Sequence, residues 1–427
     1  MYIYIKLKYL LSVFKNYLYY LIVHQIIFIR YRKSICLLSK KLKKESKLLA
    51  VLHTESIGGL ITQINFYYKI SKIYNLDFKQ SFYYLSNGKN CNDYLIKKLK
   101  TNIEINIDKE LYDVLMNKGL MKYLLLKGLV IPFDNDFINL LPEINYPLNF
   151  TKWEMNKGKK ILNKLGLSEL QNIVAVSWKS NDYWHNFGLD KPWDAYRESS
   201  PEKLLKGLKY LSSKGFNVVI VGDHNNINFD AQFFNLDALN KSDREFIDIF
   251  IFKIAQFSII GQMGLKFIPE LFGKKVLHHN AMLPQFQSRG IFLPKKYKYL
   301  KSKSIISLSN LLKLKLLQFF NDEGIFKFRK IEPLLFRNIE YFYLNGISLE
   351  ENSEDEILNA IKEMLIYIKT GELKLSKKDE CLQRKFRSVF FNNKKLFTNS
   401  KFNYGTFFGG YVSPSFLRKN KKFLDIQ

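Results

Sequence analysis

Cysteine is scarce in this chain of 427 residues, and its three copies, Cys36, Cys91 and Cys381, lie far apart in the sequence. No two of them form a C-x-x-C pair, and their number is odd. This usage argues against a disulfide framework and against a cysteine-ligated zinc site. We therefore expect the protein to work in a reducing, cytoplasmic setting.

Acidic residues are also few, 39 against 67 Lys and Arg, and the formal net charge is +28. One interpretation is codon bias, because Lys, Asn, Ile, Phe and Tyr are abundant throughout, as in proteins from AT-rich genomes. The other is an anionic partner: nucleic acid, acidic lipid or a phosphate-bearing substrate. The lysines are scattered, and no zinc finger, aromatic RNA-binding signature or recognition-helix pattern accompanies them. We expect a phosphate-bearing substrate and an anionic membrane surface as partners, and no nucleic acid.

The sequence has no apolar run long enough to cross a membrane. The uncharged stretch near the N-terminus extends only from Asn16 to Ile29, short of the roughly 20 residues that a spanning helix needs, and no small-residue cleavage site follows it. Segment 1–46 is nevertheless hydrophobic, aromatic and basic, which suits a helix lying on anionic lipid. We expect a peripheral protein at the inner face of the plasma membrane. A helix packed on the protein's own core, or a full span, is the alternative.

The length predicts two domains, because a single hydrophobic core seldom supports so long a chain. From residue 48 onward, short apolar runs alternate with amphipathic helices, which predicts an α/β fold with parallel sheets. In such sheets the carboxyl ends of the strands share one edge, where ligands bind. The closing stretch YVSPSFLRKN shows no pattern that predicts a local structure. Capping boxes predict three helix starts, at Thr151 with Glu154, Ser242 with Glu245, and Ser353 with Glu356.

The strongest candidate site is the junction SIIGQMGLKFIPELFG, from Ser258 to Gly273. An apolar strand runs into a turn with a glycine at each end, and a helical pattern follows. The glycines let the backbone turn sharply, and the start of a helix there would direct N–H groups at a phosphate. A tight turn without a ligand is the alternative. The residues expected to bind the phosphate are Gly261, Gln262, Met263 and Gly264.

Further polar residues leave neighbouring strands at the same predicted edge. A lysine there can neutralise phosphate charge, an arginine can clamp a phosphate with two hydrogen bonds, and an aspartate can bind a sugar hydroxyl. Each of them can instead belong to a solvated loop, a turn cap or a structural ion pair. These residues are Ser177, Lys179, Asp182, Arg197, Gly222, Asp223 and Asn280.

His53 and Glu55 follow the first strand of the N-terminal domain, beside a glycine turn at Gly58 and Gly59. Either side chain can take a proton from an acceptor hydroxyl if the two domains face each other across a cleft. A histidine with a structural role is the alternative.

Several motifs together resemble a family of bacterial glycosyltransferases from surface-polysaccharide gene clusters. They include LNFTKWEMNKGKKILNKLGL, AYRESSPEKLLKGLKYLSSKGFNVVIVGD, DREFIDIFIFKIAQFSIIG, ENSEDEILNAIKEML and SPSFLRKN, in this order between His53 and Asn420. The resemblance implies a GT-B-like fold of two Rossmann-like domains, a nucleotide-sugar donor bound to the C-terminal one, and no essential metal.

The chain departs from the family pattern at three places. Where the family shows a His-Val-Arg-Asp run, this sequence has Ser177 to Ser180, and Gly59 stands where the family has a histidine. The family's serine-containing turn is Gly-Gln-Met-Gly here. A catalytically degenerate binding or assembly protein is therefore an alternative, and a basic nucleic-acid-binding protein is a further one.

From the resemblance we expect a hexosyltransferase-type enzyme, without a cofactor, that moves a sugar from a nucleotide-sugar to a lipid-linked glycan or surface-polysaccharide precursor. Arg197, Lys179 and the glycine turn would hold the diphosphate, and His53 or Glu55 would act as the base. Four parts are expected: a basic amphipathic segment (1–46), an acceptor domain (47–150), a nucleotide-sugar-binding domain (151–350), and a C-terminal helix with a basic tail (351–427).

Overall fold

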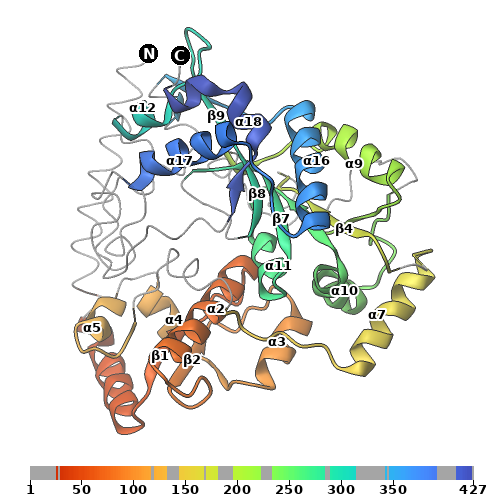
Figure 1. Cartoon of the computed structure of the whole chain (residues 1–427). Helices are drawn as coiled ribbons and strands as arrows, with labels where there is room; N and C mark the ends of the chain where they lie inside the picture. The colour runs from red at the N-terminus through yellow and green to blue at the C-terminus, as the bar shows by residue number, and fades with distance from the viewer. Residues whose placement is uncertain are drawn as a thin grey trace. The chain divides into compact units, whose positions relative to one another are not determined.

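The computed structural model describes residues 26, 29–116, 120–131, 144–167, 170–180, 196–222, 233–283, 289–313, 342–343, 346–391 and 410–425. The chain divides into two compact units, each of which is described by itself (Figure 1). Unit 1 comprises Met1–Ile138 with Phe320–Asn345, and unit 2 comprises Asn139–Phe319 with Gly346–Gln427. Each unit is an α/β structure around a parallel sheet, which confirms the predicted fold class.

Unit 1 has a sheet of three parallel strands in the order β1-β2-β3. A helix joins each strand to the next, and the side chains of Ser56 and Asn92 cap these two helices by accepting hydrogen bonds from backbone N–H groups. The alternation of apolar runs and amphipathic helices predicted from residue 48 onward is confirmed here by β1, α2, β2 and α3. The elements are β1 (Leu48–Val51), α2 (Ile57–Ile73), β2 (Phe82–Ser86), α3 (Asp93–Lys100), β3 (Ile105–Ile107), α4 (Lys109–Met116) and α5 (Met121–Leu125).

A helix over residues 29–44, red in Figure 1, precedes β1. Ile35, Leu38 and Leu42 lie on one face of it and pack into a buried cluster with residues of β1, α4 and α5. The described part of this segment thus packs on the protein's own core along one face. Residues 1–25, 27 and 28 of the predicted interfacial segment lie outside the described residues. Within the described part of the chain, every helix is too short or too polar to cross a bilayer.

Unit 2 has a sheet of six parallel strands in the order β11-β8-β7-β6-β4-β5. Among its inner strands, β4 and β6 are buried along their whole length, as expected for a parallel sheet with helices on both faces. The strands are β4 (Ile173–Ser177), β5 (Asn217–Ile220), β6 (Phe257–Ile260), β7 (Lys275–Ala281), β8 (Gly290–Pro294) and β11 (Tyr411–Val412). Two further strands, β9 (Lys296–Tyr299) and β10 (Ile347–Glu350), form a separate antiparallel pair.

The helices of unit 2 begin where hydrogen-bonding caps occur. The capping boxes at Thr151 and Ser353 are both formed. The prediction of a box at Ser242 is wrong, because Asn240 caps that helix and Ser242 already lies in its first turn. The helices are α7 (Lys152–Lys164), α9 (Glu202–Ser213), α10 (Lys241–Ile254), α11 (Phe267–Leu271), α12 (Leu308–Lys313), α16 (Glu354–Thr370), α17 (Lys377–Phe391) and α18 (Pro414–Lys419).

The C-terminal stretch, set apart as 351–427 in the sequence-based division, packs onto the six-stranded sheet. Helix α16 contacts α9, β7 and β8, and β11 pairs with β8 at the sheet edge. The stretch YVSPSFLRKN, for which the sequence predicted no structure, contains β11 and α18. Glu363 of α16 holds it, because this carboxylate accepts hydrogen bonds from the Ser413 hydroxyl (2.6 Å) and the Ser415 backbone N–H (2.8 Å).

Candidate functional site

Four polar side chains of unit 1, which we call the His53 cluster, meet at the carboxyl edge of the three-stranded sheet. His53 and Glu55 follow β1, Asn87 follows β2, and Tyr112 lies on α4, the helix after β3. The Tyr112 hydroxyl contacts His53 Nδ1 closely and donates to Glu55 Oε1 at 3.3 Å. Asn87 Nδ2 donates to the other carboxylate oxygen at 2.8 Å. Parallel topology is the reason that residues so far apart in sequence meet here.

The proton positions in the cluster follow from the tautomer of His53. In the tautomer in which the Tyr112 hydroxyl donates its proton to Glu55, His53 Nδ1 is the N–H donor to the hydroxyl oxygen. Nε2 is then the basic nitrogen of the ring, as in a histidine that a carboxylate orients for acid–base work. The backbone N–H of His53 also donates to Gln63 Oε1 at 2.6 Å, which fixes the main chain at this point.

The electrostatics keep Glu55 ionised and Tyr112 protonated. Burial alone would raise the pKa of Glu55, but hydrogen bonds from His53, from its own backbone and from Asn87 bring that pKa below its ordinary value. Burial and the nearby Glu55 carboxylate raise the pKa of Tyr112 well above its ordinary value. The side chains of His53 and Glu55 are 33% and 40% exposed, whereas Tyr112 is buried. A substrate hydroxyl can therefore reach the histidine while the tyrosine supports it from inside.

Gly58 and Gly59 form the first turn of α2, beside the cluster. A Cβ atom at Gly59 would lie 2.9 Å from the Cβ of His53, closer than side-chain atoms pack. The absence of a side chain at Gly59 is therefore a steric requirement for the position of His53. Gly58 contributes its carbonyl, which accepts a hydrogen bond from the Thr62 hydroxyl at 2.7 Å.

A second set of functional groups, the cation group Lys179, Arg197, Lys266 and Lys295, belongs to unit 2 at the carboxyl edge of its sheet. Lys179 follows β4, Lys266 follows β6 and Lys295 follows β8. Lys295 Nζ donates to the carbonyls of Tyr196 and Glu198, both at 2.8 Å, and so fixes the loop that carries Arg197. Arg197 Nε in turn donates to the carbonyl of Gln262 at 3.0 Å.

Burial makes two of these lysines unusual. It lowers the pKa of Lys266 to about 8, with Glu270 acting to raise it and Arg197 to lower it further. Burial likewise lowers the pKa of Lys295 to about 8, partly offset by the carboxylates of Glu351 and Glu198. Both lysines are charged at neutral pH, although loss of solvent makes the charged form less favourable than it is in water. An anion bound beside Lys266 would relieve that cost.

The neighbouring histidines are neutral. Burial lowers the pKa of His279 to about 4 and that of His278 well below its ordinary value. His279 Nε2 and both ring nitrogens of His278 are buried and have no hydrogen-bond partner among the described residues. The two buried imidazole rings of β7 therefore add no positive charge near the carboxyl edge of the sheet.

The glycine bend, Gly261 to Gly264, directly follows β6 and is partly filled by its own surroundings. The backbone N–H of Gly261 donates to Ser177 (2.9 Å), and that of Met263 donates to Gly261 (2.8 Å). A Cβ at Gly261 would lie 3.2 Å from the Ser199 hydroxyl and 3.4 Å from the His279 ring, so these neighbours would have to shift slightly to accept a side chain. The helical pattern after the bend begins as a 3-10 turn, Gly264–Lys266, and only the five residues of α11 are α-helical. So short a helix gives little support to the predicted phosphate site, which stays a prediction.

Three other predicted donor-binding residues have partners within the protein. The Ser177 hydroxyl donates to the carbonyl of Val221 at 2.6 Å and lies 3.2 Å from the sulfur of Met263. The carbonyl of Gly222, a residue with φ of 98°, accepts from the Arg244 guanidinium at 2.6 Å. Buried Gln262 accepts from the backbone N–H of Met282 through Oε1 (3.3 Å).

Asn280 is held from both sides. Its backbone N–H donates to Asn352 Oδ1 (2.6 Å), its Oδ1 accepts from the Asn352 backbone N–H (2.7 Å), and its Nδ2 donates to the Ser199 hydroxyl (3.0 Å). These contacts stabilise the positive φ of 51° at Asn280. Asn280 thus joins the end of β7 to the start of α16.

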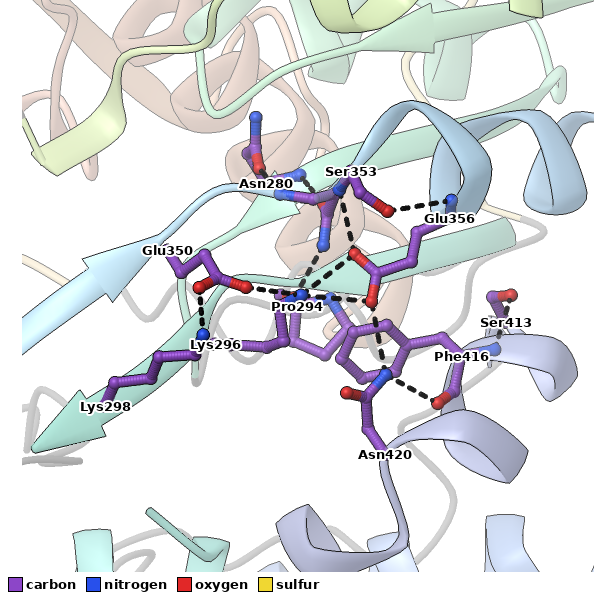
Figure 2. Close-up of polar contacts among 11 residues, drawn as sticks. Asn280, Pro294, Lys296, Lys298, Glu350, Ser353, Glu356, Ser413, Phe416 and Asn420 are labelled. Carbon is purple, nitrogen blue, oxygen red and sulfur yellow. Dashed lines mark hydrogen bonds and ion pairs between the residues drawn. The ribbon is translucent and has the colours of Figure 1, made fainter. Parts of the chain in front are cut away.

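Figure 2 shows the buried network that fixes this start of α16. The Glu356 carboxylate receives Lys296 Nζ at 3.1 Å, the Ser353 backbone N–H at 2.9 Å and Asn420 Nδ2 at 3.3 Å. The Lys296 ammonium also pairs with Glu350 at 2.7 Å. One carboxylate therefore binds β9, α16 and the C-terminal helix together beside the carboxyl edge of β8.

The remaining predicted donor-binding residues, Asp182 and Asp223, lie outside the described residues. The structure places His53 Nδ1 3.9 Å from Glu55 Oε1, and it adds Tyr112, Asn87, Lys266 and Lys295, which sequence reasoning missed. Asn87, Lys266 and Lys295 follow a strand or its turn directly, so the rule applied to other strand ends was sufficient to find them. Tyr112 carries no such signal, because it lies inside α4 rather than at the end of a strand.

Among the described residues, no group of three or more His, Cys, Asp or Glu side chains is placed to hold a metal ion.

No protein-family model matches the chain, and neither does any curated protein. Among solved structures, the chain is similar to ADP-heptose LPS heptosyltransferase II of E. coli, with 12% identity and a TM-score of 0.36 over 58% of this chain and 90% of that one. It is also similar to a glycosyl transferase family 9 protein from Veillonella parvula, with 12% identity and a TM-score of 0.43 over 75% of this chain and 98% of that one. Likeness at this level is no argument for a shared activity.

Proposed function

We propose that the chain is a glycosyltransferase that moves a sugar from a nucleotide-sugar donor to a lipid-linked glycan or a precursor of a surface polysaccharide. The observation that carries the proposal is the His53 cluster: a partly exposed histidine at the carboxyl edge of a parallel sheet, oriented by a protonated tyrosine and an ionised carboxylate. The ordered motifs that resemble surface-polysaccharide glycosyltransferases support it.

The His53 cluster would supply the acid–base chemistry of the transfer. In a glycosyl transfer, the acceptor hydroxyl must lose its proton as it attacks the sugar carbon. Nε2 of His53 would take that proton, and the charge that forms on the ring would be stabilised through Tyr112 by Glu55.

The cation group of unit 2 would hold the donor. The leaving group is a nucleoside diphosphate, and its developing negative charge is the main electrostatic demand of the reaction. Arg197 and Lys266 would supply compensating charge, and Lys295 would hold the loop that carries Arg197. We propose that the reaction needs no metal ion, because side-chain cations would take that role.

The test is a panel of UDP-, GDP-, ADP- and CMP-linked sugars, assayed with the full chain for thermal stabilisation and for release of the nucleotide. We expect one donor to raise the melting temperature and to be turned over. His53→Gln is expected to slow turnover at least about 100-fold without changing the donor-induced stabilisation. Arg197→Gln is expected to reduce the stabilisation, whereas Lys160→Gln, an exposed charge removal on α7, is the matched control.

Two outcomes would count against the proposal. If no nucleotide-sugar stabilises the protein, the donor assignment fails. If a donor binds but turnover is absent, or is unchanged in His53→Gln, the protein is a binding or assembly relative of the enzymes whose motifs it resembles.

A further inference from the structure

The helix over residues 29–44 has two faces of different character. The inner face packs on the core of unit 1 through Ile35, Leu38 and Leu42, which are at most 6% exposed. At about 100° per residue, a stripe at positions 29, 33, 37, 40 and 44 points roughly 170° away from them. We call this stripe the outer face; it consists of Ile29, Lys33, Leu37, Lys40 and Lys44, all exposed.

The outer face combines two properties that seldom occur together on a soluble surface. Its apolar members are strongly exposed, Ile29 at 73% and Leu37 at 58%, and Ile26, one turn earlier, is 60% exposed. Lysines stand between and beyond them along the stripe. Large apolar side chains interleaved with lysines are the pattern of an interfacial helix, in which apolar groups enter the acyl boundary and lysines reach the headgroups.

The other charged residues of the helix are also positive. Arg30, Arg32, Lys41 and Lys43 flank the stripe and are exposed too. The sequence contains no Asp or Glu before Glu45, so no acidic residue in the segment offsets them. A surface that is positive and carries isolated apolar side chains complements an anionic bilayer, whereas a nucleic acid would gain nothing from Ile29 and Leu37.

We propose that the outer face of helix 29–44 docks unit 1 on an anionic lipid bilayer. The inner face fastens the helix to the β1 core, so the docked helix carries the whole unit with it. This inference does not depend on the proposed enzymatic activity, and vesicle binding tests it separately.

The experiment is co-sedimentation of the full chain with vesicles of pure phosphatidylcholine, or of three parts phosphatidylcholine to one part phosphatidylglycerol. We expect binding to the anionic vesicles only, weakened by added salt. Changing Lys33, Lys40 and Lys44 to Gln is expected to lower the partition coefficient roughly 100-fold, about fivefold for each charge. The matched control changes Lys97, Lys100 and Lys160, exposed lysines on other helices, and is expected to lower it less than threefold.

A tryptophan at the apolar position reports insertion directly. Leu37→Trp is expected to shift its emission to shorter wavelength on anionic vesicles, and Ile107→Trp, at an equally exposed site (61%), is expected not to shift. Three results would overturn the proposal: equal binding to neutral vesicles, the same loss in the control triple variant, or an outer-face variant that loses duplex DNA binding while it keeps vesicle binding.

Discussion

Removing the Glu356 carboxylate is expected to be among the most damaging single changes to unit 2. Its side chain is 3% exposed, and its main partner, the Lys296 side chain, is 9% exposed. Breaking a buried ion pair costs about 3–5 kcal/mol when the partner is left unpaired. Lys296 keeps Glu350 at 2.7 Å, so the lower end, about 3 kcal/mol, applies. The lost capping bond to Ser353 adds about 1 kcal/mol.

The Glu356→Ala variant should therefore lower the free energy of unfolding by about 4 kcal/mol, measured by urea unfolding of the full chain and followed by near-ultraviolet circular dichroism. Glu350→Ala is the matched control, because it removes the other carboxylate of Lys296. Its side chain is 38% exposed, so about 1 kcal/mol or less is expected. The combination Lys296→Met with Glu356→Leu should recover most of the loss, since no buried charge is left unpaired. Equal destabilisation by Glu356→Ala and Glu350→Ala would refute the reasoning.

Three further predictions concern the candidate site. Tyr112→Phe should slow turnover about tenfold, less than His53→Gln, because the hydroxyl only fixes the ring tautomer; equal losses in steady-state assays would contradict the assigned roles. Gly59→Ala should reduce turnover by moving His53, whose Cβ lies 2.9 Å from the added atom, and turnover equal to that of the unchanged chain would contradict this steric role. The pKa of Lys266 is about 8 in the folded protein, against an ordinary 10.5. Between pH 8 and 10.5 this side chain binds fewer protons in the folded than in the unfolded state, so its contribution to the free energy of unfolding rises with pH. The gain from pH 8 to 9.5 should be on the order of 1 kcal/mol, and Lys266→Met should remove it in unfolding experiments; a pH profile identical in the two proteins would show that the lysine is not buried as described.

The elements of the fold were largely predictable from the sequence, because local signals dictate them. Apolar runs such as NIVAVSW fit a buried parallel strand, and the capping boxes at Thr151 and Ser353 mark helix starts by hydrogen bonds that close within four residues. The misplaced start at Ser242 shows the limit of this approach: Asn240, two residues earlier, offers an equally good cap, and the pattern alone cannot choose between them.

Only part of the candidate site could be predicted from the sequence. His53 and Glu55 stand out because they follow a strand directly, and the topology of a parallel sheet guarantees that strand ends meet at one edge. Tyr112 enters the cluster from a helix 59 residues away in sequence from His53, and no local pattern identifies the rotation of that helix which points its hydroxyl at the ring. Asn280 shows the opposite case. The sequence predicts that it binds the donor, whereas in the structure its backbone N–H donates to Asn352 and its side-chain amide donates to Ser199.

By itself the sequence determined the α/β class, the order of most strands and helices, and the edge at which polar groups gather, since periodicity, capping and chain direction are properties of neighbouring residues. Only the tertiary structure decided which of those groups touch one another, which lysines lose their water, and that helix 29–44 packs one face on the core while exposing the other. Those properties depend on distances between residues that are remote in the chain, and such distances are fixed by packing.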